Sequence, residues 1–226
     1  MAALKRLQNE IENSRACSRL VRYCQLVART KRAMYRGQTY WGKAVPSFGD
    51  PQAGLLVIGL APAAHGGNRT GRMFTGDRSG DFLFRGLHEA GFANQPTSRR
   101  RRDGLKLTGC YITAAVRWAP PMNKPTPGEI RQCLPFLRQE LDLLHQVKAV
   151  LVLGRVAFDA YLQIVRTEAK LPPRAQMPFA HGAVYELLAP LPRLICSYHP
   201  SQRNTQTGKL TPAMFQSVLQ QACDYL

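Results

Sequence analysis

Four short apolar runs, separated by longer segments of helical pattern, constrain the fold of this chain more than any other feature. The runs cover residues 55–60, 111–116, 149–154 and 193–198. Each has the length and apolar character of a strand that is buried on both faces. Alternation of such strands with helices favours a three-layer α/β/α sandwich around a mostly parallel four-stranded sheet. We expect residues 1–226 to form one domain with a helical N-terminal segment.

Helix signals lie between the runs. Thr126 and Glu129 have the spacing of a capping box, and Pro135 should interrupt the helix that they begin. We therefore expect a turn there and a fresh helix over residues 135–145. We expect an N-terminal helix in which Leu4, Leu7 and Ile11 share a face. Further helices are expected after Cys17, over residues 82–90 and after Thr211, and an edge strand is expected around residues 184–187.

Two loops rich in glycine and arginine follow the first and the last apolar run. They cover residues 59–77 and 198–208. In a parallel sheet both loops fall at the carboxyl ends of strands, where ligand crevices form. Glycines let backbone amides approach an anion closely, and an aromatic residue such as Phe74 offers a stacking face to a base. The pattern predicts nucleic-acid chemistry.

The charge balance supports a polyanionic partner. The chain has 31 Lys and Arg against 14 Asp and Glu, a formal charge of +17. Binding to DNA should therefore depend strongly on salt. Residues 95–103, with four consecutive arginines, read as an exposed, mobile loop. No membrane span or signal-peptide core is visible in the sequence, and we expect a cytoplasmic, nucleoid-associated protein.

The chain closely resembles the family 5, or type B, uracil-DNA glycosylases. The resemblance runs from about residue 16 to the C-terminal helix, through 40–41, the two loops, 111–116, 119–121, 123–125 and 181–182. It implies a monofunctional DNA-repair glycosylase that hydrolyses the N-glycosidic bond of uracil and leaves an abasic site. Hypoxanthine and xanthine are further candidate bases. The expected partner is double-stranded DNA, with single-stranded DNA as an alternative, and the expected state is a monomer.

The resemblance also assigns roles to single residues. His199 is the candidate catalytic donor to the departing base, because negative charge grows on an oxygen attached to the base ring as the glycosidic bond breaks. Asp77 is the candidate for positioning water or stabilising the sugar cation, with ordinary loop capping between Gly76 and Ser79 as the alternative role. His65 could orient water or a phosphate, or serve only in a turn.

The remaining site residues divide into substrate and DNA contacts. Substrate contacts are expected from Gly59, Ala61, Phe74, Ala114, Asn123 and Asn204. DNA contacts are expected from Arg69, Arg72, Lys124, Gln202 and Arg203, of which Gln202 or Arg203 would fill the gap left by the extruded nucleotide. Better-known uracil glycosylases have a polar or acidic residue in place of Ala61 and, where they demand uracil, Asn in place of Ala114. The resemblance thus implies a relaxed choice of base.

A second departure concerns the iron–sulfur cluster that is usual in the family. The four ligand positions correspond to Ser14, Cys17, Trp118 and Cys133, and only two of these are thiols. Such clusters ordinarily need four thiolates. We therefore expect no cofactor and no metal, with Trp118 filling the space by apolar packing. Cys24 and Cys110 are the remaining alternative ligands.

Two other functions compete with excision. A damage-binding protein that recognises flipped bases without turnover, or with weak turnover, is compatible with Ala61, Ala114 and the missing thiolates. A soluble nucleotide-binding α/β protein is also conceivable, but the strong positive charge and the full set of motifs count against it.

Overall fold

The computed structural model describes residues 2–226. Its centre is a six-stranded sheet in the order β1-β3-β2-β4-β6-β5. Four parallel strands form the middle, namely β3 (Cys110–Ala114), β2 (Leu55–Gly59), β4 (Ala149–Leu153) and β6 (Arg193–Ser197). Each begins within two residues of an expected run. Two short antiparallel strands, β1 (Phe48–Gly49) and β5 (Val184–Tyr185), add the edges. The sequence indicated the second edge strand but not the first.

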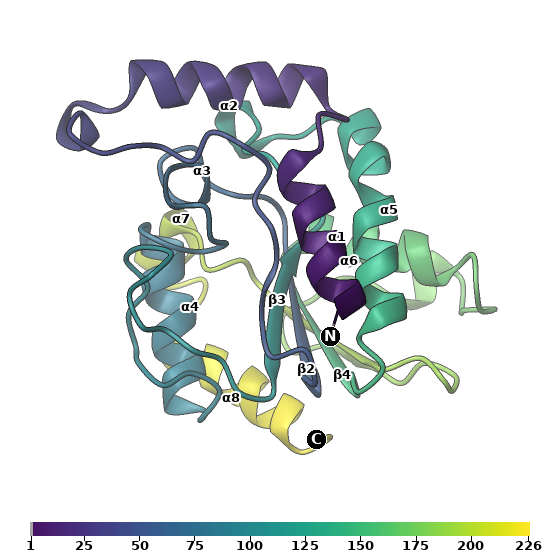
Figure 1. Cartoon of the computed structure of the whole chain (residues 1–226). Coiled ribbons are helices and arrows are strands. Elements are labelled where there is room, and N and C mark those ends of the chain that lie inside the picture. Colours follow the sequence, from purple (N-terminus) through teal and green to yellow (C-terminus); the bar gives the residue numbers. More distant parts are fainter. Residues whose placement is uncertain (1) are drawn as a thin grey trace.

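Helices cover both faces of the sheet, as the alternating pattern predicts (Figure 1). One face packs against α4 (Arg78–Glu89) and α8 (Pro212–Cys223). The other packs against α1 (Ala2–Asn13), α5 (Pro127–Leu143) and α6 (Arg155–Val165). Within β2, Leu55 and Val57 belong to the first core, and Leu56 and Ile58 to the second. Period-two alternation thus buries each strand on both sides.

The remaining helices are shorter or lie beyond the ends of the sheet. Helix α2 (Ser18–Thr30) packs through Leu20 and Cys24 into a third apolar cluster. Within the loops lie α3 (Gly67–Thr70), α7 (Gln202–Gln206) and the 3-10 turns η1 (Ala33–Tyr35), η2 (Pro121–Asn123) and η3 (Arg174–Gln176). Among the described helices, none is long and apolar enough to cross a membrane.

Helix α5 corrects the expected break at Pro135. Both halves of the capping box at Thr126 and Glu129 are formed, but the helix continues through the proline to Leu143. Pro135 is exposed, and its neighbours Leu134 and Leu137 are buried in the core. An interior proline costs about 3 kcal/mol. Burial of large apolar side chains at roughly 1.5–3 kcal/mol each offsets that cost.

Candidate active site

Strands β2 and β3 end side by side, and their last residues form the floor of the candidate site. Gly59 of β2 pairs in register with Ala114 of β3. The ring of Phe74 lies directly against Gly59, where an added Cβ would come within 2.7 Å of the ring atom Cζ. Gly59 is therefore required for the ring to lie over the strand end. Phe74 has a φ of 50°, a conformation that the surrounding loop must impose on a non-glycine residue.

His199 faces Phe74 from the loop after β6. The two ring centroids are 5.9 Å apart and the planes are inclined by 32°. The backbone at His199 is fixed, because its carbonyl accepts hydrogen bonds from Asn204 Nδ2 at 2.9 Å and from the amide of Ser201 at 2.7 Å. Among residues 2–226, no hydrogen bond engages the imidazole itself. The ring is therefore held in place with its nitrogens available to a ligand.

The protonation state of His199 follows from its surroundings. Burial lowers the pKa of His199 to about 4. The imidazole is therefore neutral at pH 7, with one nitrogen that donates a hydrogen bond and one that accepts.

Asp77 begins helix α4 and lies beside the first loop. Its Oδ1 accepts a hydrogen bond from the amide of Gly80 at 2.9 Å, so the side chain is the N-cap of the helix. This cap starts the helix at Arg78, four residues earlier than expected. The other oxygen, Oδ2, lies against Gly66, where a Cβ would overlap it. Burial raises the pKa of Asp77, although the Gly80 and Ser79 amides and the charge on Arg69 oppose that shift.

Arg69 and His65 form the outer part of the first loop. The Arg69 guanidinium donates to the carbonyls of His65 and Gly76 at 2.7 and 2.8 Å and lies 4.1 Å from the Tyr35 ring centroid. Its third nitrogen, Nη1, donates to Gln38 Oε1 at 2.6 Å, so all three guanidinium nitrogens hold this part of the chain. His65 Nδ1 is 2.9 Å from the hydroxyl of Tyr40. Burial and the nearby charges of Arg32 and Arg69 lower the pKa of His65.

Arg72 does not lie where a phosphate contact requires. Only 4% of the residue is exposed, and its guanidinium forms an ion pair with Asp103 at 2.8 Å. It also donates to Thr75 and Ser98. The expected DNA contact of Arg72 is therefore wrong: the side chain is a buried support under the loop of residues 98–103.

The other expected contacts lie on two exposed segments. Gln202 and Arg203 are exposed on α7, while Asn123 and Lys124 are exposed at the turn that follows β3. Ala61 packs against the third apolar cluster instead of offering a polar group. The structure thus brings together Gly59, Phe74, Ala114, Asn204 and His199, and it leaves the exposed residues around them available to DNA.

His181 is a positioning residue that the sequence reasoning did not assign. Its Nδ1 accepts a hydrogen bond from the amide of Tyr198 at 3.2 Å, and its ring stacks on Tyr198 with centroids 5.1 Å apart. His181 therefore fixes the chain immediately before His199. The only signal in the sequence is the motif at residues 181–182, which carries no role by itself.

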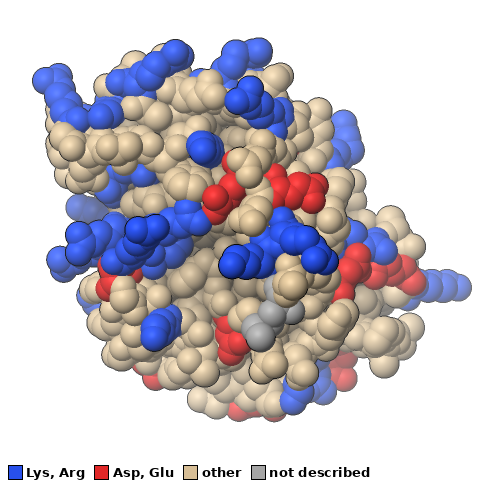
Figure 2. All heavy atoms as spheres, in the orientation of Figure 1, with Lys and Arg blue, Asp and Glu red and all other residues tan. Residues whose placement is uncertain are grey.

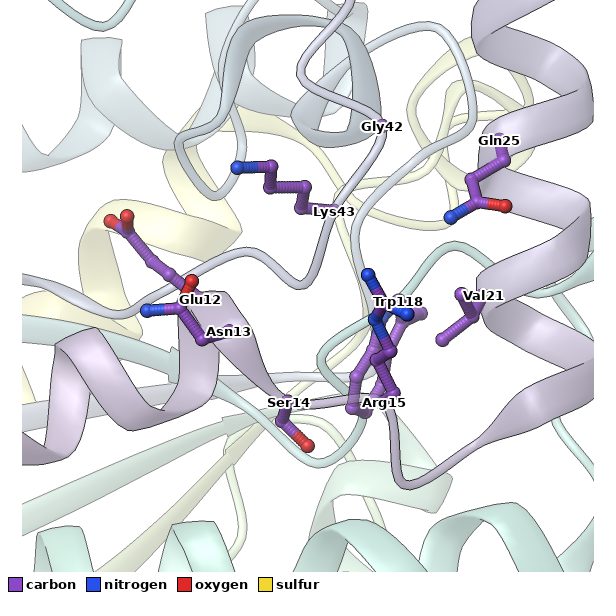
Figure 3. Close-up of a pocket in the computed structure, with 9 residues that line it drawn as sticks. All are labelled: Glu12, Asn13, Ser14, Arg15, Val21, Gln25, Gly42, Lys43 and Trp118. Carbon is purple, nitrogen blue, oxygen red and sulfur yellow. The ribbon is translucent and has the colours of Figure 1, made fainter.

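The region of the family's cluster ligands does not fit a four-thiolate cluster. The Sγ atoms of Cys17 and Cys133 are 3.8 Å apart in the third apolar cluster, and the buried Trp118 packs in the same cluster. Trp118 and Ser14 also line a cavity of about 140 Å³ (Figure 3). Cys24 belongs to this cluster, whereas Cys110 lies in the core on the α4 and α8 side. Within residues 2–226, no three His, Cys, Asp or Glu side chains are grouped to hold a metal.

Comparison with known proteins assigns this chain to a family. A model of the uracil DNA glycosylase superfamily matches residues 46–223. A type-5 uracil-DNA glycosylase of Thermus thermophilus is 50% identical over 211 residues, which are 92% of this chain and 91% of the relative. The chain belongs to the type-5 uracil-DNA glycosylases. A type-5 uracil-DNA glycosylase of Mycobacterium leprae is 47% identical over 221 residues, which are 97% of this chain and 94% of the relative.

The type-4 enzymes are more distant. The type-4 uracil-DNA glycosylase of Pyrobaculum aerophilum is 27% identical over 165 residues, which are 72% of this chain and 74% of that protein. The type-5 enzyme of the same organism is 44% identical over 214 residues, which are 95% of this chain and 89% of that protein. The type-5 assignment therefore agrees with the resemblance seen in the motifs.

Proposed function

We propose that this chain excises uracil from DNA by hydrolysing its N-glycosidic bond, with Phe74 and His199 as the two sides of the base site. The observation that carries the proposal is the pairing of these rings, 5.9 Å apart, over the carboxyl ends of β2 and β6. An extruded uracil stacks on Phe74 and presents a carbonyl oxygen to the imidazole of His199.

The neutral imidazole of His199 assists the breakage of the glycosidic bond. The electron pair of the C1′–N1 bond passes to the base, and negative charge develops on its carbonyl oxygens while the sugar becomes oxocarbenium-like. A hydrogen bond from the His199 imidazole stabilises that charge. The second oxygen of Asp77, Oδ2, orients a water toward C1′ and receives its proton, which leaves an abasic site. The uracil anion takes up a proton from solvent.

The methyl groups of Ala61 and Ala114 set the substrate range in this proposal. Neither side chain offers a hydrogen-bonding group to a base edge, so the site does not reject hypoxanthine or xanthine through an unpaired polar group. Double-stranded DNA is the primary substrate, and the protein acts as a cytoplasmic monomer at the nucleoid. It needs no iron–sulfur cluster, because Ser14 and Trp118 cannot supply thiolates.

The test uses labelled duplexes that contain uracil, hypoxanthine or xanthine, followed by alkaline cleavage. We expect abasic product from uracil under single-turnover conditions, and slower product formation from the other two bases. A duplex with thymine at the same position is the control. Binding to the uracil duplex at saturating protein, without product, would instead identify a damage-binding protein.

A further inference from the structure

Residues 98–103, here called the arginine loop, carry a dense positive charge. Arg99, Arg100, Arg101 and Arg102 are all exposed. Arg101 is paired with Glu12 and lies 4.4 Å from the Trp41 ring centroid. Across the described chain, no acidic side chain pairs with the other three. Figure 2 shows how strongly Lys and Arg outnumber Asp and Glu on one face of the molecule.

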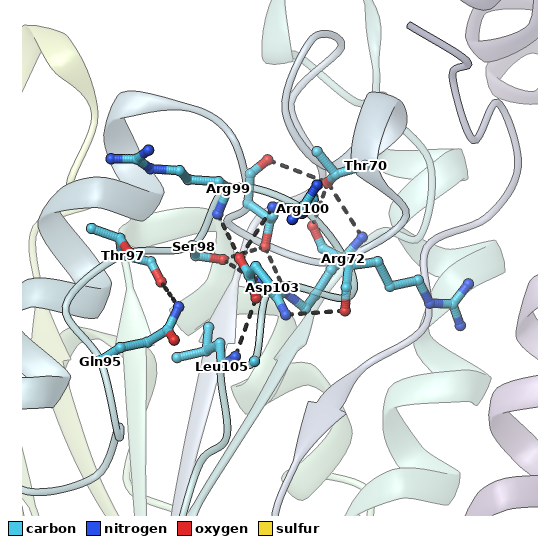
Figure 4. Close-up of polar contacts among 12 residues, drawn as sticks. Thr70, Arg72, Gln95, Thr97, Ser98, Arg99, Arg100, Asp103 and Leu105 are labelled. Atoms are coloured by element: carbon cyan, nitrogen blue, oxygen red, sulfur yellow. Dashed lines mark hydrogen bonds and ion pairs between the residues drawn. The ribbon is translucent and has the colours of Figure 1, made fainter.

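The backbone of the arginine loop is held by hydrogen bonds, a feature that its composition does not indicate. One carboxylate oxygen of Asp103 accepts hydrogen bonds from the amides of Arg99 and Arg100 at 2.7 and 3.1 Å (Figure 4). The other accepts from the amide of Leu105 at 3.2 Å. Both oxygens accept from Arg72. Burial by itself would raise the pKa of Asp103, but these donors together hold it below its ordinary value.

The same contacts join the arginine loop to the candidate active site. Arg72 donates to the hydroxyl of Thr75 at 3.0 Å and to that of Ser98 at 2.8 Å. The amide of Gly76 donates to the carbonyl of Ser98 at 2.8 Å. Thr75 and Gly76 are the residues between Phe74 and Asp77. A shift of the arginine loop would therefore displace the segment that carries the base-stacking ring.

We propose that Arg99, Arg100 and Arg102 bind backbone phosphates of the DNA beside the extruded nucleotide. The Arg72–Asp103 ion pair holds the loop that carries these three arginines at a set position relative to the base site. The inference rests on the proposed function for its substrate, DNA. A loop whose backbone is already held by hydrogen bonds loses less conformational entropy on binding than a flexible loop does. The same charges therefore give tighter binding on the held loop. Phosphate contacts of this kind fix the position of a protein on DNA without reading sequence.

The first experiment measures the salt dependence of DNA binding by fluorescence anisotropy. The variant R99A/R100A/R102A is compared with K5A/R6A/K170A, which removes the same charge from α1 and from the segment after α6. Each phosphate contact contributes about 0.9 to the slope of log K against log salt, so the loop variant should lower the slope by about 2.7. The control variant should lower it by less than about 1. Equal slopes for the two variants would overturn the proposal.

The readout separates this proposal from the excision reaction. Binding is measured on an undamaged duplex and on a duplex with a stable abasic analogue, so it needs no catalysis. R99K/R100K/R102K should keep the wild-type slope, because lysine retains the charge. A protein that excises nothing but shows the loop-dependent slope would disprove the function and leave the phosphate site standing.

Asp103→Asn tests whether the loop must be held in place. The substitution removes one negative charge, so electrostatics alone predicts tighter DNA binding. Loss of the Arg72 ion pair predicts the opposite, namely weaker binding and a lower salt slope. A thermal melt establishes that the variant is folded. Tighter binding by folded Asp103→Asn would contradict the locked arrangement, and the triple variant tests the phosphate contacts if Asp103→Asn does not fold.

Discussion

The carboxyl edge of the sheet and the region around Cys17 and Cys133 use their side chains in opposite ways. At the edge, the His199 imidazole is held beside Phe74 with no hydrogen bond to another described residue. Around the two thiols, Trp118 is only 1% exposed and packs among apolar neighbours. The comparison teaches that the groups available for chemistry and the groups that stabilise this end of the fold are different residues. Substitutions in the two regions should therefore have separable effects.

Trp118→Ala should give the largest change in stability. Truncating a buried Trp to Ala typically costs about 3–5 kcal/mol, because the cavity collapses only in part. The free energy of unfolding from urea denaturation measures this loss. Trp118→Phe, which keeps an apolar ring, should lose less. The rate of excision per folded molecule should not change, and a large loss of rate without loss of stability would erase the distinction between the regions.

His199→Ala should have the largest effect on the reaction. Removing a donor that acts on developing negative charge costs about 100- to 1000-fold in rate. Single-turnover excision of uracil at saturating protein measures the rate, and anisotropy should show little change in DNA affinity. Arg203→Ala is the matched contrast, since the exposed Arg203 should show its loss mainly in binding. A normal rate for His199→Ala would remove His199 from the mechanism.

Asp77→Asn tests whether Asp77 takes part in catalysis, through the pH dependence of the excision rate. Burial raises the pKa of Asp77, so the carboxylate becomes protonated, and excision falls, at a higher pH than for an ordinary aspartate. His199, whose pKa is lowered by burial to about 4, is neutral above that pH. Asp77→Asn should lower the plateau rate about 100-fold and remove this acid limb. An unchanged pH–rate profile would leave Asp77 with only its capping role.

A stability measurement separates the two roles of Asp77. Asn also caps helices well, so Asp77→Asn should unfold near the wild-type midpoint. Asp77→Ala should lose about 1 kcal/mol more, because the amide of Gly80 loses its acceptor. Equal stability of the two variants would show that the cap contributes nothing.

Much of the fold could be predicted because the signals are local. The four parallel strands follow from continuous apolar runs, and the capping box at Thr126 and Glu129 follows from spacing alone. The predicted helix break at Pro135 was wrong, because tertiary packing of the residues on both sides of the proline keeps the helix intact. Local sequence cannot show that kind of compensation.

The site divides in the same way. The two loops and their position at strand ends could be inferred from the sequence, and so could the closeness of Phe74 and His199. Arg72 could not be placed, since its partner Asp103 is 31 positions further along the chain. Nothing in the composition of residues 95–103 shows that one carboxylate fixes the loop. Distant pairings of this kind decide which arginines remain free for DNA.

The account holds that the base site works without the family's cluster, and one preparation can test this directly. Protein purified anaerobically is divided between metal analysis and single-turnover excision of a uracil duplex. We predict abasic product from protein that contains no stoichiometric iron or sulfide. About four irons per chain with sulfide-dependent visible absorption would contradict the account. Iron-free protein that binds the duplex but forms no product would contradict it equally.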